Sequence, residues 1–429
     1  MKKNKLFGLL GEKLGHSFSP MIHSYLGDYE YRLFEIESSG LDAFMTERRF
    51  DGINVTIPYK QAVIPYCAAL SDEARAIGSV NTIVRNAVSG DLTGYNTDHY
   101  GFSVLLRYGG IDPNGKKALV LGDGGSARTV RNVLSGQGAR EIVTISRRSE
   151  TDNYGNIERH YDADIIINTT PVGMFPDNGT SLLSLKMFPQ LCGAADLIYN
   201  PMRTKLLLEA EELGIPCANG LTMLAAQAEM ASRLFAGGQR QDASARPPLS
   251  ERSEIQERAA LACGIAREIE KKARNIALIG MPGCGKSTAG RLLAQATGRS
   301  FIDIDEVIET AAGKTIPRIF AEDGEEVFRS LETRALSDAG KKSGAVIATG
   351  GGVVTRQENY GLLRQNSLIV YLERGLDELD AAGRPLSLDA GIRNLAGQRL
   401  HLYETWSNFT IRVVSDPDIT ALKIREAVI

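Results

Sequence analysis

The sequence is poor in cysteine and histidine, and its charges are nearly balanced. Five cysteines and five histidines occur in 429 residues, without the CxxC pairs or histidine spacing of a structural zinc site. The 49 basic and 52 acidic residues leave a net charge of -3, which gives no broad field to attract nucleic acid or anionic lipid. No apolar run approaches the ~18 residues of a membrane span. These absences argue against disulfide-rich, zinc-binding, nucleic-acid-binding and membrane-spanning proteins.

The start of the chain also lacks the apolar core and cleavage site of a signal peptide. We therefore expect a cytoplasmic protein whose partners are small molecules, with no nucleic acid and no membrane among them. The sequence does not indicate an oligomeric state.

Length and hydrophobic content predict more than one folded unit. A chain of 429 residues with 43% hydrophobic content exceeds the roughly 100 to 200 residues of one domain. Residues 1–237 alternate short apolar strands with helical stretches, the pattern of α/β units with parallel sheets. Residues 237–248 carry Gly, Ser and Pro without apolar periodicity and predict a linker. An amphipathic helix follows over 250–274, and either a solvated spacer or a packed helix fits its pattern.

A phosphate-binding loop opens the last part of the chain. Residues 275–293 read as strand, glycine loop and helix, and GMPGCGKS fits the pattern GxxxxGK[ST]. Backbone amides of such a loop surround phosphate oxygens, the lysine reaches the β and γ phosphates, and the hydroxyl can bind magnesium. The sequence therefore predicts an ATP site. Its candidate residues are Gly280, Gly283, Cys284, Gly285, Lys286, Ser287 and Thr288.

Polar residues after this loop indicate an acceptor site for phosphoryl transfer. Asp303 and Asp305 end a second apolar strand, where one carboxylate can hold magnesium and the other a substrate hydroxyl. Arg329 supplies a cation, and glycines 350–352 allow close approach of backbone to a small ligand. Each signal is weak alone, but their order after the phosphate loop is informative.

These segments resemble the motifs of the shikimate kinase family over about 155 residues. The matching segments, in family order, are GMPGCGKS, FIDIDEVIE, FAEDGEEVFRSLE, TGGG, GRPL and RLHLY. The resemblance implies that Asp305 and Lys286 are catalytic and that Ser287 and Asp303 hold Mg²⁺. It assigns shikimate binding to Asp305, Arg329, Gly351, Gly352 and Arg399.

The segment expected to form the lid departs from the shikimate kinase pattern. The resemblance makes Arg384 a lid arginine over the ATP phosphates, but the segment before it is short. The family's additional lid arginine has no clear counterpart unless Arg374 serves. Trp406 also stands where the family usually has a smaller residue.

A second glycine turn lies in the middle of the chain. Residues 118–134 read as a strand, the turn GDGG and a helix, which suits a dinucleotide pyrophosphate. The next strand ends at Ser146, followed by Arg147 and Arg148, where NAD-binding folds place an acidic residue. Two arginines there favour the 2′-phosphate of NADP(H). Asp123 is unusual, because a carboxylate beside a pyrophosphate repels it unless the side chain points away.

The segments before this turn carry acid–base chemistry. HSFSP offers two hydroxyls that suit a carboxylate, while Lys60 and Asp98 can share a proton near a carbonyl. Taken singly, Lys60 is more often a surface lysine and Asp98 a helix cap.

Together these segments resemble the shikimate dehydrogenase family from about residue 5 to residue 237. The ordered motifs are HSFSP, NVTIPYK, GSVNT, NTDHYG, GDGGSAR, NTTPVGM, DLIYNPMRT and GLTMLAAQ. The resemblance implies that Lys60 is the catalytic acid or base and Asp98 its partner. It assigns shikimate binding to Ser17, Ser19, Thr56, Lys60, Asn81, Asp98 and Gln227. It assigns the NADP site to Gly122, Gly124, Gly125, Ser126, Ala127, Arg128, Ser146, Arg147, Arg148, Thr169, Tyr199, Gly220 and Met223.

The two resemblances imply a bifunctional α/β enzyme. Its first half would reduce 3-dehydroshikimate with NADPH, and a P-loop domain like those of nucleoside monophosphate kinases would phosphorylate shikimate with MgATP. We expect a substrate-binding lobe at residues 1–100, completed by residues 220–237, and a Rossmann lobe that binds NADP at residues 101–219. A linker with a helix should follow at residues 238–274, and a kinase domain at residues 275–429. Two alternatives stay open: a quinate/shikimate dehydrogenase fused to a small-molecule kinase, and a regulator that binds metabolites without turnover.

Overall fold

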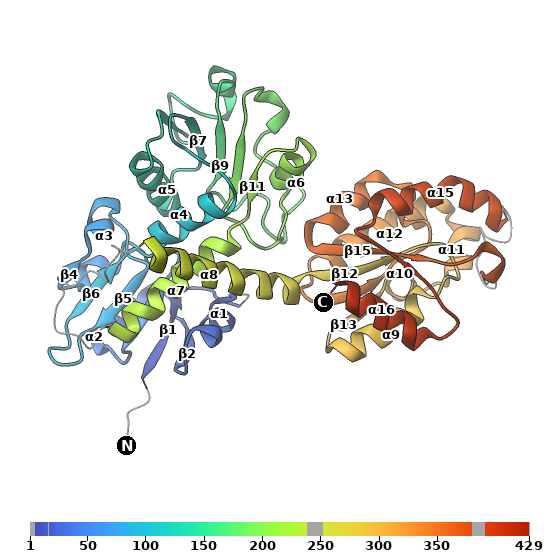
Figure 1. Cartoon of the computed structure of the whole chain (residues 1–429), viewed down its shortest axis with the longest axis horizontal. Helices are drawn as coiled ribbons and strands as arrows, with labels where there is room; N and C mark the ends of the chain where they lie inside the picture. The colour runs from blue at the N-terminus through green and yellow to red at the C-terminus, as the bar shows by residue number, and fades with distance from the viewer. Residues whose placement is uncertain (1–4, 16, 238–251, 380–390, 429) are drawn as a thin grey trace. The chain divides into compact units, whose positions relative to one another are not determined.

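The computed structural model of the chain describes residues 5–15, 17–237, 252–379 and 391–428 (Figure 1). The chain divides into two units. The first comprises Met1–Val172, Ser181–Tyr199 and Glu209–Ile269, and the second Gly173–Thr180, Asn200–Leu208 and Glu270–Ile429. Within the described ranges no helix is long and apolar enough to cross a membrane.

The first lobe of the first unit is built on a mixed six-stranded sheet of order β2-β1-β3-β5-β6-β4. Its strands are β1 (Leu6–Gly11), β2 (Glu30–Glu35), β3 (Gly52–Val55), β4 (Ala69–Leu70), β5 (Thr82–Arg85) and β6 (Leu92–Tyr95), and its helices are α1 (Ser19–Leu26), α2 (Leu41–Glu47) and α3 (Asp72–Ile77). Strand β1 runs parallel to β2 and β3, whereas β5 is antiparallel to β3 and β6. The loops after β1 and β3 therefore leave the sheet at the same edge.

The second lobe is a parallel five-stranded sheet of order β11-β10-β9-β7-β8. Its elements are β7 (Lys117–Leu121), β8 (Glu141–Ile145), β9 (Ile165–Asn168), β10 (Gly193–Asp196), β11 (Cys217–Ala218), α4 (Asp98–Tyr108), α5 (Gly125–Gly136), α6 (Lys205–Glu212) and α7 (Leu221–Gly237). Strands β7 and β9 are buried along their whole length, as the apolar runs of central parallel strands require. Helix α7 returns to contact α1 and β5 of the first lobe, so both lobes border one site.

The last part of the chain forms a parallel five-stranded sheet of order β13-β14-β12-β15-β16. Its elements are β12 (Asn275–Ile279), β13 (Ser300–Asp303), β14 (Ala345–Ala348), β15 (Ser367–Glu373), β16 (Phe409–Arg412), α9 (Lys286–Thr297), α10 (Ile304–Ala312), α11 (Ile316–Glu322), α12 (Glu325–Gly340), α13 (Gln357–Asn366), α15 (Ile392–Trp406) and α16 (Pro417–Val428). Strands β12, β13 and β14 are neighbours, so the phosphate loop, the aspartates and the glycine turn lie at one edge of the sheet.

The helix expected after the linker is α8 (Arg252–Ala273). Within the first unit the Arg267 Nε donates a hydrogen bond to the Tyr108 hydroxyl at 2.9 Å, and its guanidinium lies 5.5 Å from the centre of that ring. The apolar face of α8 is buried at Ala262, Ile265 and Ile269. Within the first unit, the helix therefore contacts α4 through Arg267 and Tyr108.

Two candidate active sites

Lys60 and Asp98 form an ion pair in the first unit. Lys60 follows β3, and Asp98 is the first residue of α4. The Nζ–Oδ2 distance is 2.6 Å, and the side chains are only 18% and 10% exposed. The backbone carbonyl of Lys60 also accepts a hydrogen bond from Val80 at 2.8 Å. The structure thus brings together the amine and carboxylate that the sequence proposes as a proton-sharing pair.

A buried amide network lies beside this pair. The Asn81 Nδ2 donates to the Thr97 Oγ1 at 3.0 Å and to the Gln227 Oε1 at 3.4 Å. The Asn81 Oδ1 accepts from the Thr97 backbone amide at 2.7 Å. Gln227 of α7 therefore reaches residues far away in sequence, as the predicted site requires. Thr97, the second residue of the NTDHYG motif, joins the predicted residues in this network.

Three candidate hydroxyls for shikimate binding, those of Ser17, Ser19 and Thr56, come from the segments after β1 and β3. The Ser17 Oγ accepts a hydrogen bond from the Ser19 amide at 3.2 Å, and Ser19 is buried at the start of α1. The Thr56 amide donates to the Leu10 carbonyl at 2.9 Å, which ties the two strand ends together. His16 of the same motif lies outside the described residues.

A buried histidine, His23, lies on α1 a little further along the chain. His23 stacks on Tyr31 at 3.9 Å between ring centres, and its Nδ1 lies 2.6 Å from the Tyr29 hydroxyl. The Tyr31 hydroxyl donates in turn to the Asn54 Oδ1 at 2.8 Å. Burial lowers the pKa of His23 from 6.5 to about 3, against a smaller opposing effect of the hydrogen bond with Asn54. No sequence motif marked this histidine.

The glycine turn after β7 leaves room for a pyrophosphate. Gly122 has φ +105, and a Cβ there would lie 2.8 Å from Thr170 Cγ2 and 2.9 Å from Thr169 Oγ1. Around Gly124 and Gly125, by contrast, no atom would lie within 4 Å of an added Cβ. The open space faces the amino end of α5, whose first turn contains Ser126 and Ala127. These residues therefore fit a dinucleotide phosphate held by backbone amides.

Asp123 points toward the end of β8. The Ser146 Oγ donates a hydrogen bond to the Asp123 Oδ2 at 3.0 Å and accepts one from the Arg148 amide at 3.2 Å. The Asp123 side chain thus points away from the expected position of the pyrophosphate and does not repel it. Arg147 and Arg148 follow Ser146 at the same strand end.

Three further candidates come from the chain after β10 and β11. The rings of Tyr199 and Phe18, from opposite lobes, lie 5.6 Å apart between centres, and burial raises the pKa of Tyr199. A Cβ on Gly220 would overlap the Leu197 carbonyl oxygen, so only glycine fits there without a shift. Met223 is buried in the core of the second lobe.

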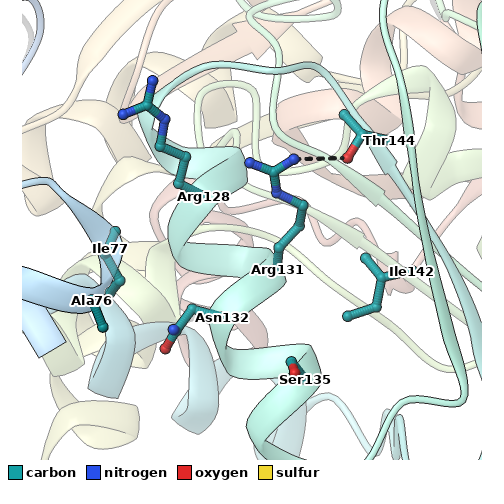
Figure 2. Close-up of a pocket in the computed structure, with 8 residues that line it drawn as sticks. All are labelled: Ala76, Ile77, Arg128, Arg131, Asn132, Ser135, Ile142 and Thr144. Atoms are coloured by element: carbon teal, nitrogen blue, oxygen red, sulfur yellow. Dashed lines mark hydrogen bonds between the residues drawn. The ribbon is translucent and has the colours of Figure 1, made fainter.

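Arg128 lies in a cavity between the two lobes. The cavity has a volume of about 440 Å³ and is lined by Ala76, Ile77, Arg128, Arg131, Asn132, Ser135, Ile142 and Thr144 (Figure 2). Arg131 hydrogen-bonds the Thr144 hydroxyl at 3.3 Å, whereas Arg128 leaves α5 in another direction (Figure 2). In the amide orientation that satisfies both partners, the Gln61 oxygen accepts from the Arg128 Nη2 at 3.3 Å. Arg128 thus contacts the substrate lobe, and no proposed shikimate-binding residue lines this cavity.

The phosphate loop of the kinase domain curls around its lysine. Gly280, Gly283 and Gly285 have φ values of +145, +80 and +99, which favour glycine. The Lys286 Nζ donates to the carbonyls of Gly280 and Met281 at 2.9 and 3.0 Å. An added Cβ on Gly285 would meet nothing within 4 Å, so space for a phosphate lies in front of α9. The loop fits a nucleoside triphosphate.

Cys284 lies in this loop and is buried, 3.8 Å from the Lys286 Nζ. Ser287 and Thr288 are exposed in the first turn of α9. The Asp303 Oδ1 accepts from the Asp305 amide at 3.0 Å and so caps α10. Mg²⁺ usually takes one or two protein oxygens together with phosphates and waters, so Ser287 and Asp303 fit it. In the described part of the chain, no group of three or more His, Cys, Asp or Glu side chains is placed to hold a metal ion.

The acceptor candidates gather around the turn after β14. A Cβ on Gly352 would overlap the Arg329 guanidinium, and one on Gly350 would overlap the Glu332 Oε1 and lie 3.1 Å from the Asp305 Oδ1. The Arg329 Nη1 donates to the Glu332 Oε2 at 2.7 Å, and Glu332 is fully buried. Glu332 lies in the same FAEDGEEVFRSLE segment as Arg329, but nothing in the sequence marks it as a site residue. Its role follows from its burial beside Arg329, and burial of this kind becomes visible only in the folded structure.

Arg399 completes this cluster. Its Nη1 donates to the Gly351 carbonyl at 3.3 Å, and the Tyr403 hydroxyl donates to the same oxygen. A Cβ on Gly351 would lie 2.6 Å from Pro282 of the phosphate loop. The acceptor turn and the nucleotide loop are therefore in direct contact.

The lid candidates are only partly described. Arg384 lies outside the described residues. Arg374 pairs with Glu378 at 3.5 Å and is 29% exposed. Trp406 is buried and stacks on Tyr360 at 4.9 Å between ring centres, so the larger side chain belongs to the core.

Comparisons with known proteins give relatives for the first unit. The NADP⁺ shikimate dehydrogenase of Clostridium perfringens strain SM101 is 38% identical over 253 residues, which are 54% of this chain and 93% of that protein. A chorismate mutase/shikimate 5-dehydrogenase fusion protein from Clostridium acetobutylicum matches with TM-score 0.54 and 32% identity, over 63% of this chain and 98% of that one. The quinate dehydrogenase of Corynebacterium glutamicum in complex with NAD matches with TM-score 0.51 and 26% identity, over 61% and 99%.

The fold and the two sites define a nucleotide-dependent oxidoreductase followed by a P-loop kinase. The family model of the shikimate dehydrogenase substrate binding domain matches residues 9–83, and that of shikimate kinase matches residues 282–428. The chain belongs to the shikimate dehydrogenase family through its first part and carries a shikimate kinase domain after it. The predicted fusion of these two enzymes is confirmed, as are the α/β fold class and the cofactors NADP(H), ATP and Mg²⁺.

Proposed function

We propose that Lys60 and Asp98 carry the proton chemistry of the dehydrogenase and that the acceptor cluster around Gly350 selects the substrate of the kinase. The chain is a bifunctional enzyme that reduces 3-dehydroshikimate to shikimate and phosphorylates shikimate. The observation that supports the proposal best is the 2.6 Å ion pair between Lys60 and Asp98 at the border of the lobes. NADPH supplies a hydride and MgATP a phosphoryl group when bound.

In the dehydrogenase, Lys60 donates a proton to the oxygen of the ketone that is being reduced. Asp98 keeps the lysine ammonium in place and accepts a hydrogen bond from a ring hydroxyl of the substrate. Asn81 and Gln227 hold further hydroxyls with their amides, while Ser17 and Ser19 bind the carboxylate. This assignment rests on the geometry of the pair and network together with the motif order.

In the kinase, Arg329 and Arg399 bind the carboxylate of shikimate, because a guanidinium offers paired donors to such a group. Asp305 orients the hydroxyl that attacks. Lys286 and the loop amides hold the phosphates, which is the main task of a protein in phosphoryl transfer. Glu332 holds the Arg329 guanidinium in place through their buried ion pair.

Substitutions of the two lysines test the division of labour. We expect Lys60→Ala to reduce dehydrogenase activity at least about a thousandfold and to spare the kinase. Lys286→Ala should do the reverse, because each lysine serves one site. The assay follows NADPH oxidation with dehydroshikimate and, separately, formation of shikimate 3-phosphate from shikimate and MgATP. Folded protein in which either change silences both activities would refute two independent sites.

The quinate/shikimate alternative keeps one supporting observation, the likeness to an NAD-bound quinate dehydrogenase. Steady-state comparison of shikimate with quinate as substrates separates the two. Our proposal also includes a cytoplasmic location and small-molecule partners, because NADPH, ATP and the two substrates are soluble metabolites. Cell fractionation followed by the coupled assay tests that part.

A further inference from the structure

The carboxylate of Asp123 is fixed at the end of β8. The Ser146 hydroxyl has one proton to donate, and its oxygen already accepts from the Arg148 amide at 3.2 Å. That proton is directed to the Asp123 Oδ2, at 3.0 Å. Ser146 is buried while Asp123 is exposed, so the serine holds the carboxylate from the protein side and leaves its other oxygen to solvent. The arrangement presents a hydrogen-bond acceptor outward.

This strand end is where a dinucleotide-binding sheet receives the adenosine ribose. Proteins that take NAD place a carboxylate there to accept hydrogen bonds from the ribose hydroxyls, whereas an arginine accommodates the 2′-phosphate of NADP. This chain presents both: the acid comes from the glycine turn after β7, and Arg147 and Arg148 lie in the turn after β8. The charges of Asp123 and Arg147 both act on the Tyr154 phenol, so they lie in one small region.

We propose that Asp123 determines cofactor preference, accepting a ribose hydroxyl of NADH and opposing the 2′-phosphate of NADPH. The dehydrogenase therefore turns over NADH as well as NADPH. Arg147 and Arg148 attract the 2′-phosphate, and the fixed carboxylate partly offsets that attraction. The inference rests on the proposed dehydrogenase reaction and adds the cofactor class that the site accepts.

Kinetics of the full chain with both cofactors test this. Asp123→Asn keeps an oxygen for Ser146 but removes the charge, so the NADPH to NADH ratio of kcat/KM should rise about tenfold, an effect within reach of one charge contact. Asp112→Asn is the matched control. It removes an exposed carboxylate from the same lobe before β7, at the opposite edge of the sheet, and should leave the ratio unchanged.

Binding of the half-cofactors 2′,5′-ADP and 5′-AMP by calorimetry gives a readout without turnover. Asp123→Asn should tighten 2′,5′-ADP about tenfold and should weaken 5′-AMP. The inference would be overturned if Asp123→Asn had an NADPH to NADH ratio of kcat/KM, and affinities for the two half-cofactors, within about twofold of wild type. If wild type turned over neither cofactor, the proposed reaction would fail, and the calorimetry alone would decide the role of Asp123.

Discussion

Glu332 is the buried charge on which the acceptor cluster of the kinase depends. It is fully buried, its Oε2 lies 2.7 Å from the Arg329 Nη1, and burial raises its pKa against the opposing charge of Arg329. Glu332→Gln should remove the buried charge partner of Arg329 and leave it paired only with the half-exposed Glu325, at 3.2 Å. We expect a loss of about 3 kcal/mol in the free energy of unfolding of the kinase domain and a rise in KM for shikimate of at least about tenfold.

Glu326→Gln is the matched control for this substitution, because Glu326 lies on the same helix and its side chain is 86% exposed. An exposed pair contributes about 0 to 1 kcal/mol, so both stability and KM should stay near wild type. Urea denaturation and kinase kinetics of the full chain measure the two effects. A Glu332→Gln enzyme with the KM of the control would contradict the role of this glutamate.

His23 should make the first unit sensitive to acid. The pKa of His23 falls from 6.5 to about 3 through burial, so between these values the unfolded chain binds a proton that the native chain does not. Stability therefore falls as pH falls through this window, by up to about 1.4 kcal/mol per pH unit. In His23→Asn this contribution disappears. Urea unfolding of the full chain at about pH 7, 6 and 5 measures it, and an equally steep pH dependence in the variant would disprove it.

Residue types with a chemical role were predictable, but buried supports were not. Lys60 and Asp98 stand in motifs that indicate acid–base chemistry, and they form an ion pair in the structure. His23 and Glu332 have no such signal, because a histidine or glutamate becomes a buried support only through packing of elements distant in sequence. Asp123 was recognised as odd, but its partner Ser146 is set by the adjacency of β7 and β8.

At the scale of elements, the turn after β14 has no spare volume. A Cβ on Gly352 would overlap the Arg329 guanidinium, which is itself buried. Gly352→Ala should therefore displace Arg329 and lower kcat/KM for shikimate about a hundredfold, since small misplacements of a binding group are costly. Gly361→Ala on α13 is the matched control. It meets no atom within 4 Å, and alanine in a helix should stabilise by about 0.5 to 1 kcal/mol.

Steady-state kinetics with shikimate as the varied substrate distinguish these two variants. Equal kcat/KM values for Gly352→Ala and Gly361→Ala would mean that Arg329 moves freely, against the packing described. The strand, loop and helix order at 275–293 was readable from sequence because glycine and lysine positions are fixed by phosphate chemistry. The two-residue strands β4 and β11 carry no periodic pattern long enough to be predicted.

At the scale of the whole molecule, each nucleotide loop lies with its own acceptor residues inside its own unit. The residues proposed for the dehydrogenase site lie on α1, α4, α7 and the loops after β1 and β3, all in the first unit. The residues proposed for the kinase site lie at the edge of the sheet formed by β12, β13 and β14, in the second unit. Within the described ranges, the residues proposed for each site therefore lie in one unit, in agreement with the order of the motifs.

Because the residues proposed for the two sites lie in separate units, we expect shikimate to pass from one site to the other through solution. Fusion raises the effective concentration of groups that are covalently tethered, and shikimate is not tethered. We expect labelled shikimate added to a coupled reaction of dehydroshikimate, NADPH and MgATP to enter shikimate 3-phosphate in proportion to its share of the free pool. An equimolar mixture of the Lys60→Ala and Lys286→Ala chains should then match the wild-type coupled rate per active site once free shikimate has accumulated. Label excluded from the product, or a wild-type chain that forms product without a lag while the mixture shows one, would demonstrate direct transfer.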